Sequence, residues 1–229
     1  MGVNVFYKGF CRVFQKAMWG IAWLLPWRTP EMISGEGSLE KLQKKKKKMG
    51  WHKVMLVTDK TILSLGLVDH LVEGMKAVDM DGEIFSDVVP NPTTHNIEDG
   101  VKFYYENKCD HIVALGGGSV IDCAKGIGAR IARPNKSVQK MKGVLKILKK
   151  LPPLIAVPTT SGTGSEATLA AVITNPENHD KYAINDPSLI PHYAVMDPLL
   201  TIGLPKGLTA TTGMDALTHA VEAFIGGEN

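Results

Sequence analysis

The stretch His111-Ile-Val-Ala-Leu-Gly-Gly-Gly-Ser119 decides the fold of this sequence. Its apolar start contains β-branched residues and is typical of a buried strand, which the glycines end abruptly. Residues 120–133 follow with helical character, so we predict a strand, a tight turn and a helix in immediate succession. This succession is typical of α/β proteins with a mainly parallel sheet.

The same alternation of strands and helices continues on both sides of that stretch. We predict strands at 53–57, 83–89, 153–157 and 193–197, and a hairpin built from 170–174 and 181–184. We predict helices at 38–49, 62–78, 96–106 (capped at Thr94 or Asn96) and 208–224 (with Thr212 as a candidate cap). Three parts result: an amphipathic extension (1–30), an α/β nucleotide-binding domain (31–204) and the start of a helical domain (205–229).

The charge and the cysteine content limit the partners and the cellular compartment that we expect. The formal net charge of +3 becomes −2 without the five consecutive lysines Lys44–Lys48, so the body is mildly acidic and we expect no nucleic-acid partner. Three cysteines without paired spacing predict a reducing compartment, and we expect a cytoplasmic protein.

The first 30 residues carry an amphipathic pattern. Apolar residues such as Phe10, Val13 and Phe14 recur at helical spacing, while Lys8, Arg12 and Lys16 fall on another face. The most apolar part is about half as long as a bilayer span requires. We favour a helix that docks on a partner surface, with peripheral membrane attachment as the alternative.

Two loops of small residues follow predicted strands. Gly116–Ser119 brings glycines to a helix start, where backbone amides can approach a diphosphate, and 158–166 adds hydroxyl groups. The alternative for each is a tight turn without a ligand, but two such loops at the carboxyl ends of parallel strands meet in one crevice. Asp59, after the first strand, either hydrogen-bonds a ribose or caps the next helix.

A carboxylate and an imidazole share one face of the last predicted helix. Asp215 and His219 are four residues apart, which places their side chains one turn from each other. Such a pair suits Fe(II), Zn or Mn, whereas the alternative is an ordinary surface pair.

Together these motifs resemble the iron-containing (group III) alcohol dehydrogenases. The matching segments are Gly-Gly-Gly-Ser-x-x-Asp (116–122), Pro-Thr-Thr-Ser-Gly-Thr-Gly-Ser-Glu (158–166) and Gly-Met-Asp-Ala-Leu-Thr-His-Ala-Val-Glu (213–222), and the order fits from Glu31 onward. The resemblance implies a dehydroquinate-synthase-like fold: an N-terminal NAD(P)-binding α/β domain followed by an all-helical metal domain, here only begun. It also implies reversible oxidation of a primary alcohol by hydride transfer to NAD, with Fe(II), or in some members Zn, as the metal.

The resemblance also assigns roles to individual residues. Asp59 faces the adenosine ribose, which favours NAD over NADP, and Asp215 and His219 are the first two of four metal ligands. No side chain is assigned a catalytic role. The residues expected to contact the dinucleotide are Asp59, Asn91, Gly117, Gly118, Ser119, Asp122, Thr159, Thr160, Thr163 and Lys181.

Several alternatives stay open. The family's other two metal ligands are histidines in later helices, so we expect a fragment, or a shortened protein that binds dinucleotide weakly with little turnover. A related member acting on other substrates, such as a glycerol dehydrogenase or a maleylacetate reductase, is a further alternative. The expected partners are a small alcohol or aldehyde; a membrane is disfavoured, and a homo-oligomer is left open.

Overall fold

The computed structural model describes residues 27–46, 50–77 and 81–226, together with positions 9, 11–13, 20 and 25. Most of the predicted N-terminal helix lies outside these residues. No helix in the described part of the chain is long and apolar enough to cross a bilayer.

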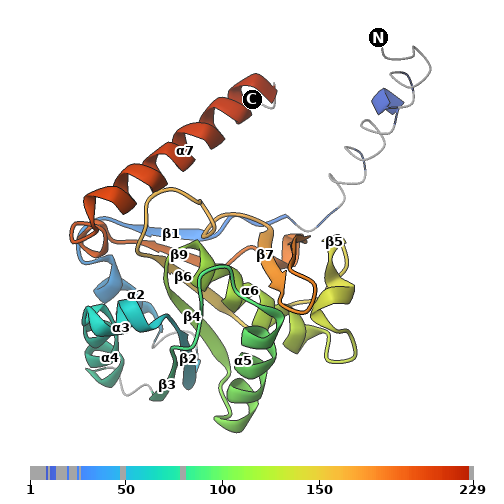
Figure 1. Cartoon of the computed structure of the whole chain (residues 1–229). Coiled ribbons are helices and arrows are strands. Elements are labelled where there is room, and N and C mark those ends of the chain that lie inside the picture. The colour runs from blue at the N-terminus through green and yellow to red at the C-terminus, as the bar shows by residue number, and fades with distance from the viewer. Residues whose placement is uncertain are drawn as a thin grey trace.

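A six-stranded parallel sheet forms the centre of the molecule (Figure 1). Its strand order is β1-β9-β6-β4-β2-β3. The bounds of these strands are β1 (Glu31–Ser34), β2 (Lys53–Val57), β3 (Asp81–Phe85), β4 (His111–Gly116), β6 (Leu154–Pro158) and β9 (Tyr193–Met196). A smaller sheet, ordered β5-β8-β7, consists of β5 (Gly143–Val144), β7 (Ala170–Asn175) and β8 (Asp180–Asn185).

Helices cover both faces of the large sheet. The α-helices are α2 (Ser38–Lys46), α3 (Lys60–Ser64), α4 (Leu67–Ala77), α5 (Thr94–Glu106), α6 (Gly118–Ala132) and α7 (Lys206–Gly226). The described residues also form three short 3-10 helices: η1 (Val138–Met141), η2 (Pro187–Leu189) and η3 (Pro198–Leu200).

Strand β2 explains why the sheet has helices on both sides. Val54 and Leu56 belong to a core cluster that includes residues of α2, α3 and α4, whereas Met55 and Val57 belong to a cluster that includes residues of α5 and α6. All four side chains are fully buried. Each such burial contributes about 1.5–3 kcal/mol, so a continuous apolar strand specifies a two-sided cover.

The α/β fold with a mainly parallel sheet is confirmed, as is the antiparallel hairpin, which forms β7 and β8. Some predicted boundaries were wrong. The helix predicted at 62–78 is divided into α3 and α4 by Gly66, whose φ of 70° interrupts a helix. The strand predicted at 83–89 is β3, which starts and ends earlier, and β1 was not predicted.

Two predicted helix caps were also wrong. Helix α5 is capped by Thr93, whose hydroxyl accepts from the Asn96 amide while Asn96 Oδ1 accepts from the Thr93 amide. Helix α7 begins at Lys206, so Thr212 lies inside it and donates its hydroxyl to the Leu208 carbonyl.

Candidate functional site

The reversal of strand order lies between β2 and β4, because β3 lies on one side of β2 and β4, β6 and β9 on the other. In open α/β sheets, ligands bind beyond the carboxyl ends of the strands at this point. The loops that follow β2, β4 and β6 carry Asp59, Gly117–Ser119 and Thr159–Thr163. The fold therefore gathers these predicted site residues at one edge of the sheet.

The loop at 116–119 is here called the glycine loop, and the loop at 158–166 the threonine loop. The two loops lie against each other. A Cβ added to Gly117 would lie 3.4 Å from Thr160 Oγ1, and one added to Gly118 would lie 2.9 Å from Thr163 Cγ2. The second distance is shorter than Cβ atoms show, so any side chain at position 118 would force Thr163 to move. The sequence suggested a ligand or a tight turn as the reason for these glycines, and the packing of the two loops is a further reason.

The start of α6 is suited to bind an anion. Gly117 is its N-cap and supplies no side-chain hydrogen bond to the first turn. The first amides of a helix have no partner within the helix and carry the positive end of its dipole. A diphosphate is the kind of group that such a helix start accommodates.

Thr159 supplies a second feature that fits a ligand. Its side chain is 1% exposed, and among the described residues its hydroxyl has no hydrogen-bond partner. A buried hydroxyl without a partner costs free energy, which a bound polar group can recover.

Asn91, Ser119 and Lys181 form a third group at the same edge. Lys181 Nζ donates to Asn91 Oδ1 at 2.8 Å, and the Asn91 amide donates to Ser119 Oγ at 3.3 Å. Asn91 adopts a φ of 56°, which asparagine tolerates better than most residues. Three predicted cofactor contacts from distant parts of the sequence thus lie together.

Asp59 caps α3, which is the alternative that its sequence position suggested. Its Oδ1 accepts from the backbone amides of Thr61 at 2.8 Å and Ile62 at 2.9 Å. Capping uses this single oxygen, so the capping role and a contact with a ribose are compatible.

Asp122 faces the interior. It is 9% exposed, and its Oδ2 accepts from the Val172 amide of β7 at 3.0 Å. Burial raises the pKa of Asp122, and the nearby charge of Lys125 opposes that shift. In this structure Asp122 therefore holds β7 against α6.

Lys125 is a residue that sequence reasoning missed. Its side chain is fully buried, and Nζ donates to Thr168 O at 2.8 Å, Thr168 Oγ1 at 3.0 Å and Ala170 O at 2.8 Å. Burial lowers the pKa of the Lys125 ammonium to about 8. Its spacing of three from Asp122 places the two side chains near each other on one helix, but it does not reveal that Lys125 is buried.

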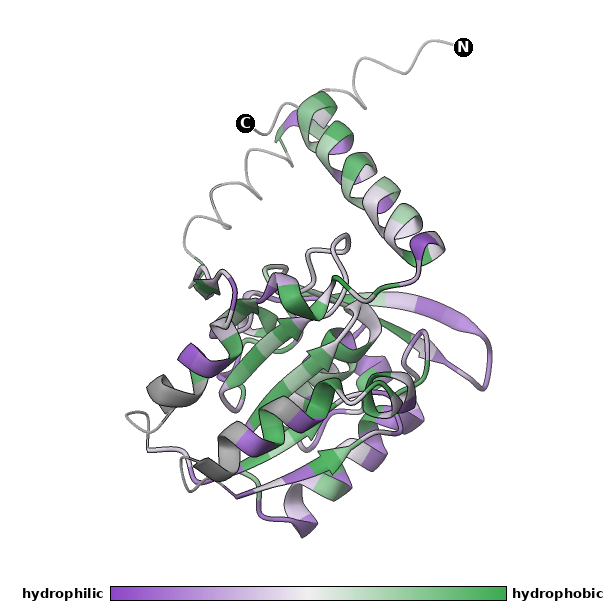
Figure 2. Ribbon diagram, turned by 90° about the vertical axis from the view of Figure 1, so that its left-hand side faces the viewer, coloured by the Kyte–Doolittle hydropathy of each residue, from purple (hydrophilic) through white to green (hydrophobic). Residues whose placement is uncertain are grey.

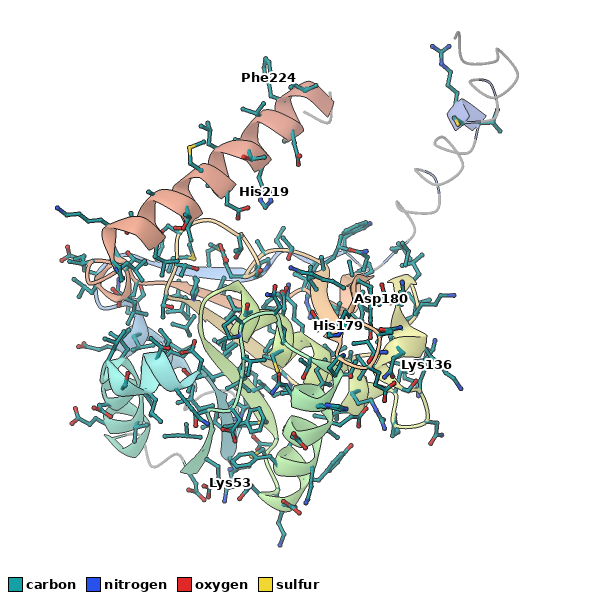
Figure 3. The ribbon with its side chains drawn as sticks, viewed as in Figure 1. Lys53, Lys136, His179, Asp180, His219 and Phe224 are labelled. Carbon is teal, nitrogen blue, oxygen red and sulfur yellow. The ribbon has the colours of Figure 1, made fainter. Side chains whose placement is uncertain are left out.

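The predicted metal ligands lie on α7, which extends away from the sheet (Figures 1 and 2). Asp215 Oδ1 and His219 Nε2 are 3.9 Å apart, and their side chains are 44% and 55% exposed. His219 lies on the side of α7 that faces the sheet, and Phe224 on the opposite side (Figure 3). His219 therefore faces the part of the molecule that contains the sheet.

The threonine loop contacts α7 directly. A Cβ on Gly162 would lie 2.5 Å from the Thr212 carbonyl oxygen, so only glycine permits this approach. The donor set of Asp215 and His219 suits Fe(II) or Zn. In the described part of the chain, however, no group of three or more ligating side chains is present.

Two sulfur-containing side chains near the site differ in burial. Cys123 is fully buried in α6, whereas Met214 on α7 is 60% exposed. His192, to which no role was assigned, accepts from the Leu154 amide through Nδ1 at 3.1 Å.

The chain is similar in sequence and in structure to known proteins. Residues 29–198 match the family model of the iron-containing alcohol dehydrogenases. Alcohol dehydrogenase 4 of Schizosaccharomyces pombe is 42% identical over 84% of this chain and 46% of its own length. NAD-dependent methanol dehydrogenase of Bacillus methanolicus is 36% identical over 86% of this chain and 51% of its own.

Solved structures of other proteins are also similar to this chain. A crystal structure of 1,3-propanediol oxidoreductase superimposes with a TM-score of 0.83 at 39% identity, covering 88% of this chain and 53% of that one. Sulfoacetaldehyde reductase from Bifidobacterium kashiwanohense, in complex with NAD+, gives 0.77 at 32% identity, covering 87% and 53%. The chain spans about half the length of the relatives it matches.

Proposed function

The chain belongs to the iron-containing alcohol dehydrogenase family, and on that premise we propose that it binds NAD in a metal-dependent oxidoreductase acting on a small primary alcohol or its aldehyde. The observation that carries the proposal is the direct packing of the glycine loop on the threonine loop beside the uncapped start of α6. One relative is NAD-dependent by name, and one structural neighbour holds NAD+.

We assign the diphosphate to the start of α6 and to the threonine loop. The amides of Gly118 and Ser119 would donate to its oxygens, and Thr159 would recover a partner for its buried hydroxyl. Thr160 and Thr163 border the same loop contact. These groups bind and orient the dinucleotide without any proton transfer.

We place the adenosine end at Asp59 and a further cofactor contact at Asn91 and Lys181. A carboxylate at the end of β2 would accept from ribose hydroxyls and repel a 2′-phosphate, which favours NAD over NADP. The hydrogen bond between Lys181 and Asn91 holds both side chains at the edge of the sheet.

We assign Asp215 and His219 as two ligands of a divalent metal, Fe(II) or Zn. When bound, such a metal polarises an alcohol oxygen and lowers its pKa. The residues of this chain would hold that ion on the side of α7 that faces the sheet, where His219 lies (Figure 3).

A second candidate function is dinucleotide binding by this chain without turnover. It is favoured because the described residues contain no group of three potential metal ligands, whereas tight sites use three or more. Glycerol dehydrogenase-like or maleylacetate reductase-like chemistry remains the alternative for the substrate, and a cytoplasmic location remains the expectation for the compartment.

Binding and turnover measurements separate these functions. Titration calorimetry of the 229-residue chain with NADH tests the dinucleotide site, and Gly118→Val, which would collide with Thr163, is the matched variant. Alcohol-dependent NADH production with added Fe(II) or Zn tests turnover. Absence of NADH binding, or equal binding by Gly118→Val, would contradict the dinucleotide site. Binding without turnover would support the second candidate.

A further inference from the structure

One segment of the described surface carries a strong excess of positive charge. No acidic residue occurs between Asp122 and Glu166. The part of this region that forms η1, β5 and the following loop, residues 136–150, is here called the basic strap (Figure 1). Its lysines are Lys136, Lys140, Lys142, Lys146, Lys149 and Lys150.

Most of this charge is not neutralised. Lys142 forms a salt bridge with Asp180 at 2.6 Å, and Lys136 donates to the Lys146 carbonyl at 2.9 Å. The other four lysines are exposed and form no salt bridge with the described residues. The strap therefore presents positive charge directly to the solvent.

Apolar side chains are interleaved with these lysines. Val144 is 55% exposed and Leu148 is 51% exposed. The backbone amides of Ile147 and Leu148 donate to Asp186 Oδ2 at 2.8 and 3.0 Å, and Asp186 is fully buried. Leu148 adopts a φ of 45°, which is unusual for leucine. A buried carboxylate thus fixes the conformation that leaves Leu148 in solvent.

The Asp186 carboxylate also connects the strap, through Ser188, to Arg28. Asp186 Oδ1 accepts from the Ser188 hydroxyl at 2.6 Å, and the Ser188 carbonyl accepts from Arg28 Nη2 at 3.1 Å. Arg28 Nη1 also lies 3.1 Å from His192 Nε2. The pKa of His192 is lowered to about 4, mainly by burial, with contributions from the charges of Arg28 and Lys150. Residue 28 therefore lies beside the strap.

The residues before Arg28 have the same chemical character as the strap. Residues 1–27 contain Lys8, Arg12 and Lys16 and no Asp or Glu. They also contain Trp19, Trp23 and Trp27, three of the four tryptophans of the chain. Tryptophan is enriched at membrane interfaces, where its apolar ring and its polar N–H suit the headgroup region. By composition, residues 1–27 therefore carry charge of the same sign as the strap.

We propose that the basic strap binds the surface of a membrane that contains anionic lipid. Positive charge supplies attraction to lipid headgroups, and the exposed Val144 and Leu148 enter the boundary between headgroups and acyl chains. A nucleic acid would use the lysines but leave these apolar side chains exposed to water. The attachment is peripheral, and it is independent of the function proposed for the nucleotide site.

The test is sedimentation of the 229-residue chain with vesicles of phosphatidylcholine, with and without 30 mol% phosphatidylserine. We expect binding only with phosphatidylserine, and weaker binding at high salt. Lys146→Gln/Lys149→Gln is expected to weaken binding about 25-fold, because each lysine near an anionic surface contributes about a fivefold factor. Lys102→Gln/Lys206→Gln removes the same charge from α5 and α7, and is expected to change binding less than about twofold.

A second variant separates lipid from nucleic acid. Leu148→Asn keeps a residue that tolerates a positive φ and removes the apolar side chain. It is expected to weaken vesicle binding several-fold and to leave binding of a 20-nucleotide RNA unchanged. Circular dichroism melting confirms that each variant is folded. Lack of phosphatidylserine-dependent binding, equal loss in both double variants, or tighter binding of RNA than of vesicles would overturn the proposal.

Discussion

Lys181 Nζ lies 2.8 Å from Asn91 Oδ1, so β8 and the loop that follows β3 are joined by a hydrogen bond from a charged donor. Asn91 in turn donates its backbone amide to Ser119 in the first turn of α6. The two contacts form one chain of hydrogen bonds across the proposed cofactor site. The geometry of this site therefore depends on residues from three separate segments.

This chain of contacts predicts the effect of Lys181→Met. We expect the Kd for NADH to rise about tenfold, since hydrogen bonds to charged groups contribute about 1.5–3 kcal/mol. Both side chains are exposed, so the melting temperature should change little. Calorimetry on Lys181→Met, Asn91→Ala and the double variant measures the coupling. If the two effects add, the hydrogen bond plays no part in binding.

The contact between the two loops predicts the effect of Gly118→Ala. Its new methyl group would lie 2.9 Å from Thr163 Cγ2, so we expect a loss of about 1–3 kcal/mol in unfolding free energy and weaker NADH binding. Gly203→Ala is the control, because no atom lies within 4 Å of the added Cβ. Urea unfolding and NADH titration provide the measurements. Equal stability of the two variants would show that the loops are not closely packed.

The position of the Asp59 carboxylate predicts a preference for NADH over NADPH. We expect Asp59→Asn to raise affinity for NADPH relative to NADH about tenfold, because the charge that opposes a 2′-phosphate is removed. Asparagine retains the cap, so stability should be unchanged, whereas Asp59→Ala should lose about 1 kcal/mol. Parallel titrations of both cofactors measure the preference. An unchanged ratio in Asp59→Asn would leave Asp59 with capping alone.

Burial of Lys125 predicts a dependence of stability on pH. Its pKa is lowered from 10.5 to about 8, so between these values the unfolded chain holds a proton that the folded chain has lost. Stability is therefore reduced by this group below pH 8 and recovers as the pH rises towards 10.5. Relative to Lys125→Met, the free energy of unfolding should increase by about 2 kcal/mol between pH 7 and pH 9.5. A constant difference in urea unfolding would show that the three oxygen acceptors keep Lys125 charged.

The metal ligands predict a loss of metal without a loss of fold. In a full-length form that contains the family's further metal ligands, we expect Asp215→Ala and His219→Ala to abolish retention of Fe(II) or Zn, measured by elemental analysis after dialysis, while circular dichroism and NADH binding stay unchanged. Both side chains are partly exposed on α7 and neither packs in the sheet. Glu222→Ala, another acidic residue on α7, is the control. Metal retained equally by all three variants would refute the assignment.

Short apolar strands were predictable because their residues are buried on both faces. The strand predicted at 53–57 is β2, and those at 111–115 and 153–157 differ from β4 and β6 by a residue at one or both ends. Strand β1 was missed because Glu31-Met-Ile-Ser34 is mostly exposed and is ordered by its pairing with β9. Pairing between distant segments leaves no local signal in the sequence.

The sequence indicated which loops lie at the candidate site, but it did not indicate the arrangements that depend on tertiary contacts. The glycine and threonine loops were recognisable from their composition, and the structure brings them together. The interior orientation of Asp122 and the burial of Lys125 were not predictable, because both depend on where β7 and residues 165–170 pack on α6. The contact of Gly162 with α7 likewise required the fold.

The pairing of β1 with β9 has a consequence for the order of events during synthesis. Residues 31–34 leave the ribosome early, but their partners at 193–196 follow only after roughly 10–30 s at about 5–20 residues per second. Over that interval residues 31–34 have no partner strand in the sheet. Of the six strands in the described sheet, β1 is thus the first to be synthesised and the last to be incorporated.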